Sequence, residues 1–321
     1  MNHLDNFSLW ELARDGCEQT FAEKLLTHKH DLEMVGTGGL GYTASPLSVA
    51  VQYGNSEIVD ICLENGANPN SFDIRGRTPL FHAMKSTGLA VTTTLLKYNA
   101  DVSIPDDNGN TPLIRATRQG LSGLVMLLIE NKSDISAKNK DGDTSLHFSA
   151  VMGDVGCMKI LIENGADLSA KNSDGQTALH DAARCGHFAC IKILIDNRCN
   201  IDCRDDSGWT PLFAAVCDSR EDAVQILIQY GADPYLAAYI NGETPLEHAL
   251  TSEREVNNPS HRPCFRRPWS RIRVLLQDEI ARRDRIERRE AVAMGQHDRL
   301  GKGSKLYELD EGVMGILKNF L

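Results

Sequence analysis

Cysteine and histidine residues are concentrated in one short stretch of the sequence. They are His180, Cys185, His187, Cys190, Cys199 and Cys203. Thiolate and imidazole groups are the usual ligands of structural zinc, so a zinc site is one interpretation of the stretch. His180 also stands beside Asp181, which suggests acid–base chemistry, but adjacent residues of a helix point in different directions. Whether these groups meet depends on the elements that hold them.

Arginine residues are gathered nearer the C-terminus, where Phe265 and Trp269 are interspersed with Arg262, Arg266, Arg267, Arg271 and Arg273. Such a mixture can bind an acidic peptide, a phosphate or a nucleic-acid backbone. Residues 1–250, however, hold 19 Lys and Arg against 33 Asp and Glu, whereas residues 251–321 hold 15 against 11. We therefore favour electrostatic docking of this segment on the acidic remainder of the chain. A partner surface is the second interpretation, and nucleic acid, which we do not expect, is the third.

Other classes of function find no support in the sequence. It contains neither a Gly-x-Gly-x-x-Gly motif nor a phosphate-binding Gly-Lys-Ser/Thr loop, so we expect no nucleotide cofactor. No apolar run approaches the roughly 18 residues of a membrane span, and Met1–Gly16 is acidic where a signal peptide would be basic and then apolar. Nine cysteines, an odd number, fit free thiols in a reducing compartment. We expect a protein of the cytoplasm, the nucleus or both, with no metal, cofactor or catalytic residue.

An internal repeat gives the elements that must position these side chains. The tripeptide Thr-Pro-Leu or a variant recurs every 33 residues, and after 34 in the last case, beginning at Ser45, Thr78, Thr111, Thr144, Thr177, Thr210 and Thr244. Thr and Ser are helix N-caps and Pro is favoured at the first helical position, so each tripeptide predicts the start of a helix. A second apolar pattern follows, as in residues 124–129 and 157–162, and predicts a second helix.

This period of a turn and two helices, with Thr-Pro-Leu-x-x-Ala and Asn-Gly-Ala-Asp, resembles the ankyrin repeat. The resemblance covers about residues 9–252 and predicts an all-α solenoid of about eight helix-turn-helix units with β-hairpin-like loops, plus C-terminal helices. We expect a degenerate capping repeat in residues 1–35, the repeat array in 36–252, and an Arg-rich insertion with a long helix completing the last repeat in 253–294. An amphipathic helix is expected in 295–321, on the apolar stripe of Leu306, Leu309, Val313, Leu317 and Phe320.

The repeat also assigns packing positions. The Leu of each tripeptide should be buried, namely Leu47, Leu80, Leu113, Leu146, Leu179, Leu212 and Leu246. Cys190 and Cys199 take positions that hold apolar residues in other units, so we interpret the thiols as packing groups rather than zinc ligands. The ankyrin resemblance implies that His147 and His180 form hydrogen bonds within or between units. Less regular loops are predicted where a capping Gly is replaced, at Asn99, Lys132 and Arg198.

The ankyrin resemblance implies a non-enzymatic adaptor or scaffold that binds a partner protein through its concave first-helix face and its hairpin tips. The candidate binding residues are Tyr53, Arg115, Arg118, Phe148, Met152, Asp181, Arg184, Trp209 and Asp218. In the middle units, Phe148 and Met152 flanked by arginines have the composition of an interface centre. We expect a monomer with no membrane contact, and the sequence does not identify the partner. The alternative is a repeat scaffold with a catalytic or small-ligand-binding role in its groove.

Overall fold

The computed structural model describes residues 8–27, 44–84, 88–238, 242–256 and 269–293. Within these ranges the chain forms helices and no β-strand, which confirms the predicted all-α class. The helices are α1 (Leu9–Asp15), α2 (Glu18–Thr27), α3 (Pro46–Tyr53), α4 (Ser56–Glu64), α5 (Pro79–His82), α6 (Gly88–Lys97), α7 (Pro112–Arg118), α8 (Ser122–Glu130), α9 (Ser145–Met152), α10 (Val155–Glu163), α11 (Ala178–Cys185), α12 (Phe188–Asp196), α13 (Pro211–Cys217), α14 (Glu221–Gln229), α15 (Pro245–Val256) and α16 (Trp269–Ala293). The helix predicted in residues 295–321 lies outside the described residues.

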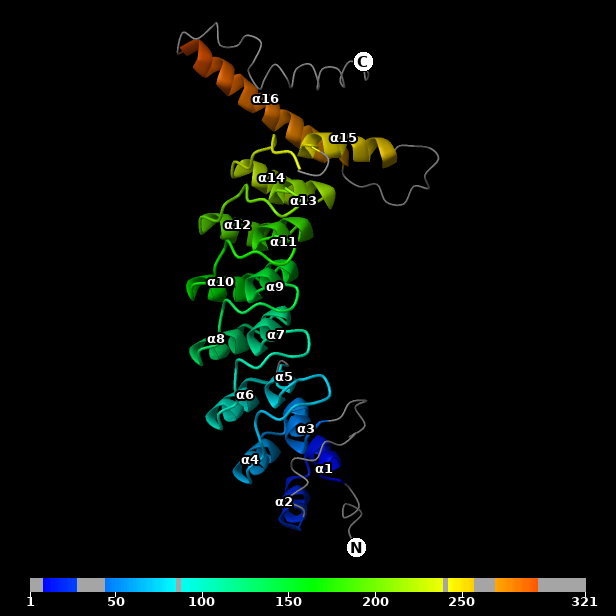
Figure 1. Ribbon diagram of the computed structural model, residues 1–321, viewed down its shortest axis with the longest axis vertical. Coiled ribbons are helices and arrows are strands. Elements are labelled where there is room, and N and C mark those ends of the chain that lie inside the picture. The colour runs from blue at the N-terminus through cyan, green and yellow to red at the C-terminus, as the bar shows by residue number, and fades with distance from the viewer. Residues whose placement is uncertain (1–7, 28–43, 85–87, 239–241, 257–268, 294–321) are drawn as a thin grey trace.

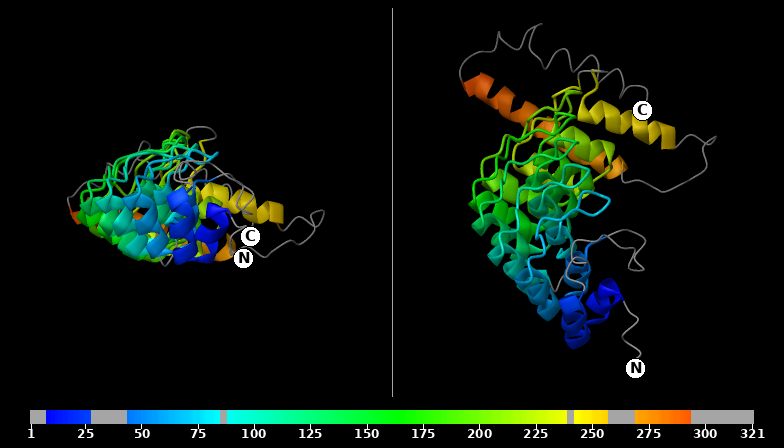
Figure 2. Two further views of the ribbon diagram at one scale, coloured as in Figure 1. Left: turned by 90° about the horizontal axis from the view of Figure 1, so that it is seen from below. Right: turned by 60° about the horizontal axis from the view of Figure 1, so that its bottom comes forward.

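The helices form a row of pairs that builds an elongated stack (Figure 1). Each odd-numbered helix packs against the odd-numbered helices of the neighbouring pairs, as α9 does against α7 and α11. The even-numbered helices form a second layer, in which α10 packs against α8 and α12. The loops that join consecutive pairs project from one side of the two layers (Figure 2). This arrangement is the solenoid that the repeat predicts.

The helices of the first layer begin where the tripeptide places them. The hydroxyl of Thr111 accepts a hydrogen bond from the backbone N–H of Ile114 at 3.3 Å, and the hydroxyl of Thr210 accepts one from Phe213 at 3.2 Å. Pro112 and Pro211 follow as the first helical residues, where the missing N–H has no helical partner to lose. The local sequence therefore sets the start of each helix and the direction in which its side chains leave the loop.

In five of the hairpin turns, an Asp or Asn five residues before the Thr closes the turn, a feature that was not predicted from the sequence. Its side-chain oxygen accepts two backbone N–H groups, as Asp205 does from Ser207 at 2.9 Å and Trp209 at 2.8 Å. Short polar side chains favour such turns because they replace a backbone acceptor. The equivalent residues are Asp73, Asp106, Asn139 and Asn172.

Neighbouring loops are joined by two repeating kinds of hydrogen bond. At the tips, a backbone N–H of one hairpin donates to a carbonyl of the preceding one, as Asp206 does to Asp174 at 3.1 Å. Nearer the helices, a cationic side chain of one unit donates to the carbonyl 33 residues further on. The donors are Lys138, Lys171 and Arg204, and each contact is 2.7 Å long. We call these three contacts the cation ladder.

The prediction of less regular loops at the replaced glycines is wrong. Asn99, Lys132 and Arg198 adopt φ of 62°, 67° and 65°, in the same left-handed region as Gly66 and Gly165. The closing bonds are also the same: Cys199 N–H donates to Leu194 at 3.2 Å, as Ala166 does to Leu161 at 2.9 Å. The left-handed conformation costs a residue with a Cβ about 1–2 kcal/mol. The hydrogen bonds that close the helix nonetheless hold these three residues in the left-handed conformation.

A continuous core runs through the stack. All seven tripeptide leucines are buried, with Leu246 the most exposed at 3%, which confirms that prediction. At the C-terminal end α16 packs against both α14 and α15, and the side chains of Trp269, Ile272 and Leu276 are buried there. Arg283 of the same helix donates to the carbonyls of Gly231 at 3.2 Å and Ala232 at 2.7 Å. The long helix thus takes the place of a second-layer helix at the end of the stack.

The longest helix that the structure describes, α16, has 25 residues and carries many charges. None of the described helices has the long apolar surface that crossing a bilayer requires.

Candidate functional site

The middle of the first layer brings together several of the predicted binding residues. The guanidinium carbon of Arg118, the last residue of α7, lies 5.6 Å from the centre of the Phe148 ring on α9. Such a cation–π contact holds both side chains in place at little cost in solvation. Met152, one turn further along α9, is 53% exposed. Arg115 is half-buried, and burial followed by the nearby charge of Arg118 lowers the pKa of its guanidinium.

A cavity of about 360 Å³ opens beside Phe148. Phe148 and Val151 of α9 line it together with Asp181 and Arg184 of α11. The hairpins in front of these helices contribute polar and charged residues, among them Lys140, Asp141, Asp143 and Asp174. We call it the Phe148 cavity. Because the two helices and the two hairpins belong to consecutive units, the cavity exists only through their stacking.

The structure corrects the expectation that Asp181 is a surface residue. Its exposed fraction is 2%. Arg184, one turn later on α11, donates from Nη2 to Asp181 Oδ1 at 3.0 Å. Burial raises the pKa of the Asp181 carboxyl to about 7, and Asp143 and Asp174 act in the same direction while Arg184 opposes it. Asp181 is therefore a buried acid on the wall of the Phe148 cavity, and it titrates near neutral pH.

Asp143 is a residue of this site that the sequence analysis missed. One potential ligand atom from each of Asp143, His147 and Asp181 lies within 4.8 Å of the other two. His147 has no free nitrogen: its Nδ1 accepts from the Thr144 N–H at 3.2 Å, and its Nε2 donates to the Gln176 carbonyl at 3.0 Å. The cluster therefore offers a cation two carboxylates rather than three ligands. The position of Asp143 in the sequence, directly before the helix-capping Thr144, could have indicated it. In the stack this position faces Asp181 of the next unit.

The two predicted histidine bridges are confirmed. His147 links its own N-cap to the carbonyl of Gln176 in the following unit, and His180 does the same between Thr177 and the carbonyl of Trp209, at 3.2 Å and 3.0 Å. Burial lowers the pKa of both imidazoles, so the neutral form is favoured. With both nitrogens in hydrogen bonds, neither ring is available as a general base. The pairing of His180 with Asp181 as an acid–base couple is not formed.

The remaining predicted binding residues do not join this group. Tyr53 is exposed at the end of α3, and Asp218 is exposed directly after α13. Trp209 is half-buried, and its ring centre lies 5.2 Å from that of Phe213, so it braces the start of α13. These three residues therefore lie outside the cluster around Phe148.

The arginine-rich segment is only partly described. Arg262, Arg266 and Arg267 lie outside the described residues. Arg271 pairs with Glu221 at 3.0 Å across α16 and α14, which agrees with docking of this segment on the acidic body. The Arg271 side chain is largely exposed, so the pair contributes at most about 1 kcal/mol.

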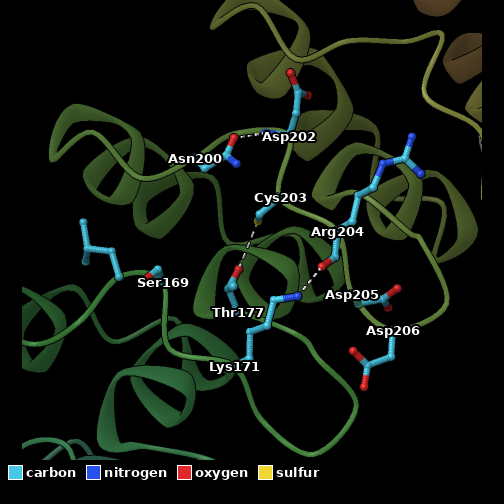
Figure 3. A pocket seen from close by; sticks show the side chains of 10 residues that line it. Ser169, Lys171, Thr177, Asn200, Asp202, Cys203, Arg204, Asp205 and Asp206 are labelled. Atoms are coloured by element: carbon cyan, nitrogen blue, oxygen red, sulfur yellow. Dashed lines mark hydrogen bonds between the residues drawn. The ribbon is translucent and has the colours of Figure 1, made fainter.

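Of the cysteines in the described ranges, three are buried and five are half-buried. Cys190 is fully buried in α12, and burial raises the pKa of its thiol to about 11. Cys203 points toward Thr177 across a second cavity of about 780 Å³, and its sulfur lies 3.3 Å from the Thr177 hydroxyl (Figure 3). Lys171 crosses the same cavity to reach the Arg204 carbonyl (Figure 3). Much of the polar lining of this second cavity is thus engaged within the protein, which leaves the Phe148 cavity as the better candidate site.

The raised pKa of Asp181 makes the stability of the protein depend on pH near neutrality. A carboxyl that is protonated in the fold but ionised in the unfolded chain stabilises the fold less as pH rises. We expect the free energy of unfolding to fall by roughly 1.4 kcal/mol between pH 6 and pH 8 on account of Asp181. Asp181→Asn should remove this slope and be more stable than the wild type at pH 8. Urea denaturation at both pH values measures it, and Asp218→Asn, an exposed control, should keep the wild-type slope.

Comparison with known proteins identifies a matching family model and a curated relative. A family model described as "Ankyrin repeats (3 copies)" matches residues 9–106, 90–172, 169–238 and 200–257. The B-cell lymphoma 3 protein homolog of Mus musculus is 35% identical to this chain over 88 residues, which are 27% of this chain and 19% of that protein. The similarity thus spans about a fifth of the mouse protein, whereas the family model accounts for almost the whole stack of helices.

Proposed function

The chain belongs to the ankyrin-repeat family, and on that premise we propose that it is a non-enzymatic adaptor that binds a partner protein through the first-layer face around Phe148. We call this face the Phe148 face, and it consists of Arg118, Phe148, Met152 and the Phe148 cavity. The single observation that carries the proposal is the contact of Arg118 with Phe148 beside an exposed Met152 and an open cavity. Aromatic, methionine and arginine side chains around a pocket are the usual composition of an interface centre.

The chemistry of the buried groups supports a binding role rather than catalysis. A cysteine nucleophile needs a lowered pKa, whereas burial raises the pKa of Cys185 and Cys203. His147 and His180 have both ring nitrogens in hydrogen bonds. The second candidate, a catalytic or small-ligand-binding role of the groove, is favoured by one observation: Asp181 lies on a cavity wall with a pKa near 7. Turnover or small-molecule binding lost in Asp181→Asn would support it.

The setting of the adaptor is also a proposal. We infer a protein of the cytoplasm, the nucleus or both, in keeping with its free thiols and its ankyrin array. The capping repeat in residues 1–35, the array in 36–252 and the completing segment in 253–294 are proposed as its parts, with 295–321 as an accessory helix. Tyr53, Arg115, Trp209 and Asp218 are proposed as secondary contacts along the same layer.

The test uses peptides selected by the intact chain from a random display library. The double variant Arg118→Glu with Met152→Glu should bind the selected peptides at least tenfold more weakly, because it replaces the exposed cation and the exposed apolar side chain of the Phe148 face. The matched control is Met126→Glu with Lys159→Glu, which makes the same kinds of change on exposed residues of α8 and α10. Fluorescence anisotropy measures both affinities, and circular dichroism checks the fold. Equal losses in the two variants, or no loss in either, would place binding on another surface.

A further inference from the structure

We propose that the Phe148 cavity receives the cationic side chain of a Lys or Arg residue of the bound partner, which pairs with Asp181 and Asp143. This inference rests on the proposed function and adds to it the chemical class of residue that the groove selects. It goes beyond the general use of a repeat groove, because it assigns a specificity to one cavity between two particular units.

The first observation is the incomplete pairing of Asp181. Its side chain is almost fully buried, yet among the described residues only Arg184 donates a hydrogen bond to it, and that bond reaches Oδ1. An ionised carboxylate has about four acceptor positions on its two oxygens, and a buried one normally fills them. Oδ2 is therefore left to a donor from the cavity that Asp181 lines.

The second observation is the position of Asp143. One of its oxygens accepts from Asn172 Nδ2 at 3.0 Å. Its carboxylate lies within 4.8 Å of the carboxylate of Asp181. An ammonium or guanidinium group forms charge-assisted hydrogen bonds of about 2.7–2.9 Å, so a single cation placed between the two carboxylates reaches both.

Charge and shape agree with such an occupant. The cavity is lined by four carboxylates, from Asp141, Asp143, Asp174 and Asp181, against the two cationic side chains of Lys140 and Arg184. Phe148 provides an apolar wall for the aliphatic stem of a Lys or Arg side chain. The volume of about 360 Å³ admits such a side chain. Arg184 is 46% exposed and has room to move aside when a second cation arrives.

A divalent metal ion fits the same cluster less well. The third member of the cluster, His147, holds the hairpin of the next unit through Gln176 and its own N-cap through Thr144. A metal would have to break one of these buried hydrogen bonds to gain a nitrogen ligand. A partner side chain needs only the two carboxylates, which is why we assign the cavity to it.

The protonation of Asp181 gives the interaction a pH dependence. Burial raises the pKa of this carboxyl most, Asp143 and Asp174 raise it further, and Arg184 lowers it. The charge of Asp181 in turn helps to raise the pKa of the Cys185 thiol. His147 faces the same cavity but is held neutral by burial. Because the cation pairs with the ionised carboxylate, affinity for it should fall roughly tenfold from pH 8 to pH 6.

The experiment is a double-mutant cycle on the peptides selected by the intact chain. The selected peptides should share one Lys or Arg, and its replacement by Met should weaken binding to the wild type at least tenfold. The same replacement should cost several-fold less with Asp181→Asn, in which Asp143 alone remains to pair with the cation, while Asp60→Asn, at an exposed position of α4, should behave as the wild type. Anisotropy at pH 8 and pH 6 should show the loss on acidification for the basic peptide with the wild type and with Asp60→Asn, but not for the Met peptide or for Asp181→Asn.

Each outcome decides between the hypotheses. Peptides that need the Phe148 face but share no basic residue, or a Lys→Met cost that persists in Asp181→Asn, would overturn the inference and leave the proposed function standing. Binding that is indifferent to Arg118→Glu with Met152→Glu, or a library that yields no binder, would contradict the proposed function and with it the inference. Calorimetric titration with zinc and with manganese provides the last arm: stoichiometric binding that is lost in Asp181→Asn would assign the cavity to a metal.

Discussion

Leu146→Ala is expected to lower the free energy of unfolding by about 2–5 kcal/mol. Leu146 is 99% buried at the start of α9, which packs against α7 on one side and α11 on the other. Truncation at this position removes apolar contacts to both neighbours and leaves a cavity that stacked helices cannot easily close. In a linear array each unit is stabilised chiefly by its neighbours, so a defect in the middle weakens two interfaces at once. Urea denaturation followed by circular dichroism measures the loss.

A matched substitution tells packing from helix propensity. Met126→Ala on α8 truncates a side chain that is 38% exposed, and we expect a change below about 1 kcal/mol. A Leu146→Ala protein as stable as Met126→Ala would contradict the continuous core.

Asp73→Ala should be the second large effect, with a loss of about 3–5 kcal/mol at pH 7. The Asp73 carboxylate is buried and accepts from the backbone N–H groups of Arg75 and Arg77 at 2.8 and 2.9 Å. It also contacts the Arg77 guanidinium at 2.7 Å and His82 Nε2 at 3.2 Å. Removal of the carboxylate takes the side-chain acceptor from two backbone N–H groups and breaks the buried contacts with Arg77 and His82, which costs more than the hydrogen bonds themselves contribute. Urea denaturation at pH 7 measures the loss.

Asp106→Ala is the control in the next unit. Asp106 closes the same kind of turn, but it is half-buried and its side-chain partner is the neutral Asn110. We expect a loss of about 1 kcal/mol there. The difference between the two variants should shrink in acid. Burial raises the pKa of Asp73, but hydrogen bonds from His82, Arg77 and the backbone outweigh it and hold the pKa well below its usual range. The contribution of Asp73 is therefore present above about pH 4 and is lost as pH falls further. Equal losses for Asp73→Ala and Asp106→Ala would refute the role of the ionic contacts.

The fold could be predicted from the sequence because the repeat carries its own instructions. Each tripeptide begins a helix, each Leu enters the core, and the 33-residue spacing makes neighbouring units stack in register. The loops at Asn99, Lys132 and Arg198 were misjudged for the opposite reason. The preference for glycine reflects the energy that the left-handed conformation costs other residues. The hydrogen bonds that end the helix outweigh this cost, so the loop keeps its shape without glycine.

The site could be predicted only in part. Position within the unit identified Phe148, Met152 and the arginines, because it reports which face of the first helix a residue occupies. It does not report depth, and Asp181 on the same face proved to be buried, with a hydrogen bond from Arg184. Asp143 was missed since it lies in a hairpin and meets Asp181 only when two units are placed side by side. Contacts between units depend on how the units are placed in three dimensions. Aligning the repeats in sequence gives the position of a residue within its unit but not this placement.

The cation ladder has a mechanical consequence. Bending the stack must lengthen or shorten the distance between loops, and from Lys138 to Ala237 three long side chains tie each loop to the next at 2.7 Å. The corresponding positions earlier in the chain hold Phe72 and Pro105, which have no side-chain hydrogen-bond donor. Thermal bending of the stack should therefore be larger toward the N-terminal end and smaller in the C-terminal half. The spacing between units at the Phe148 face would then change little when a rigid ligand binds. A longer ligand could be accommodated by bending of the stack near its N-terminal end.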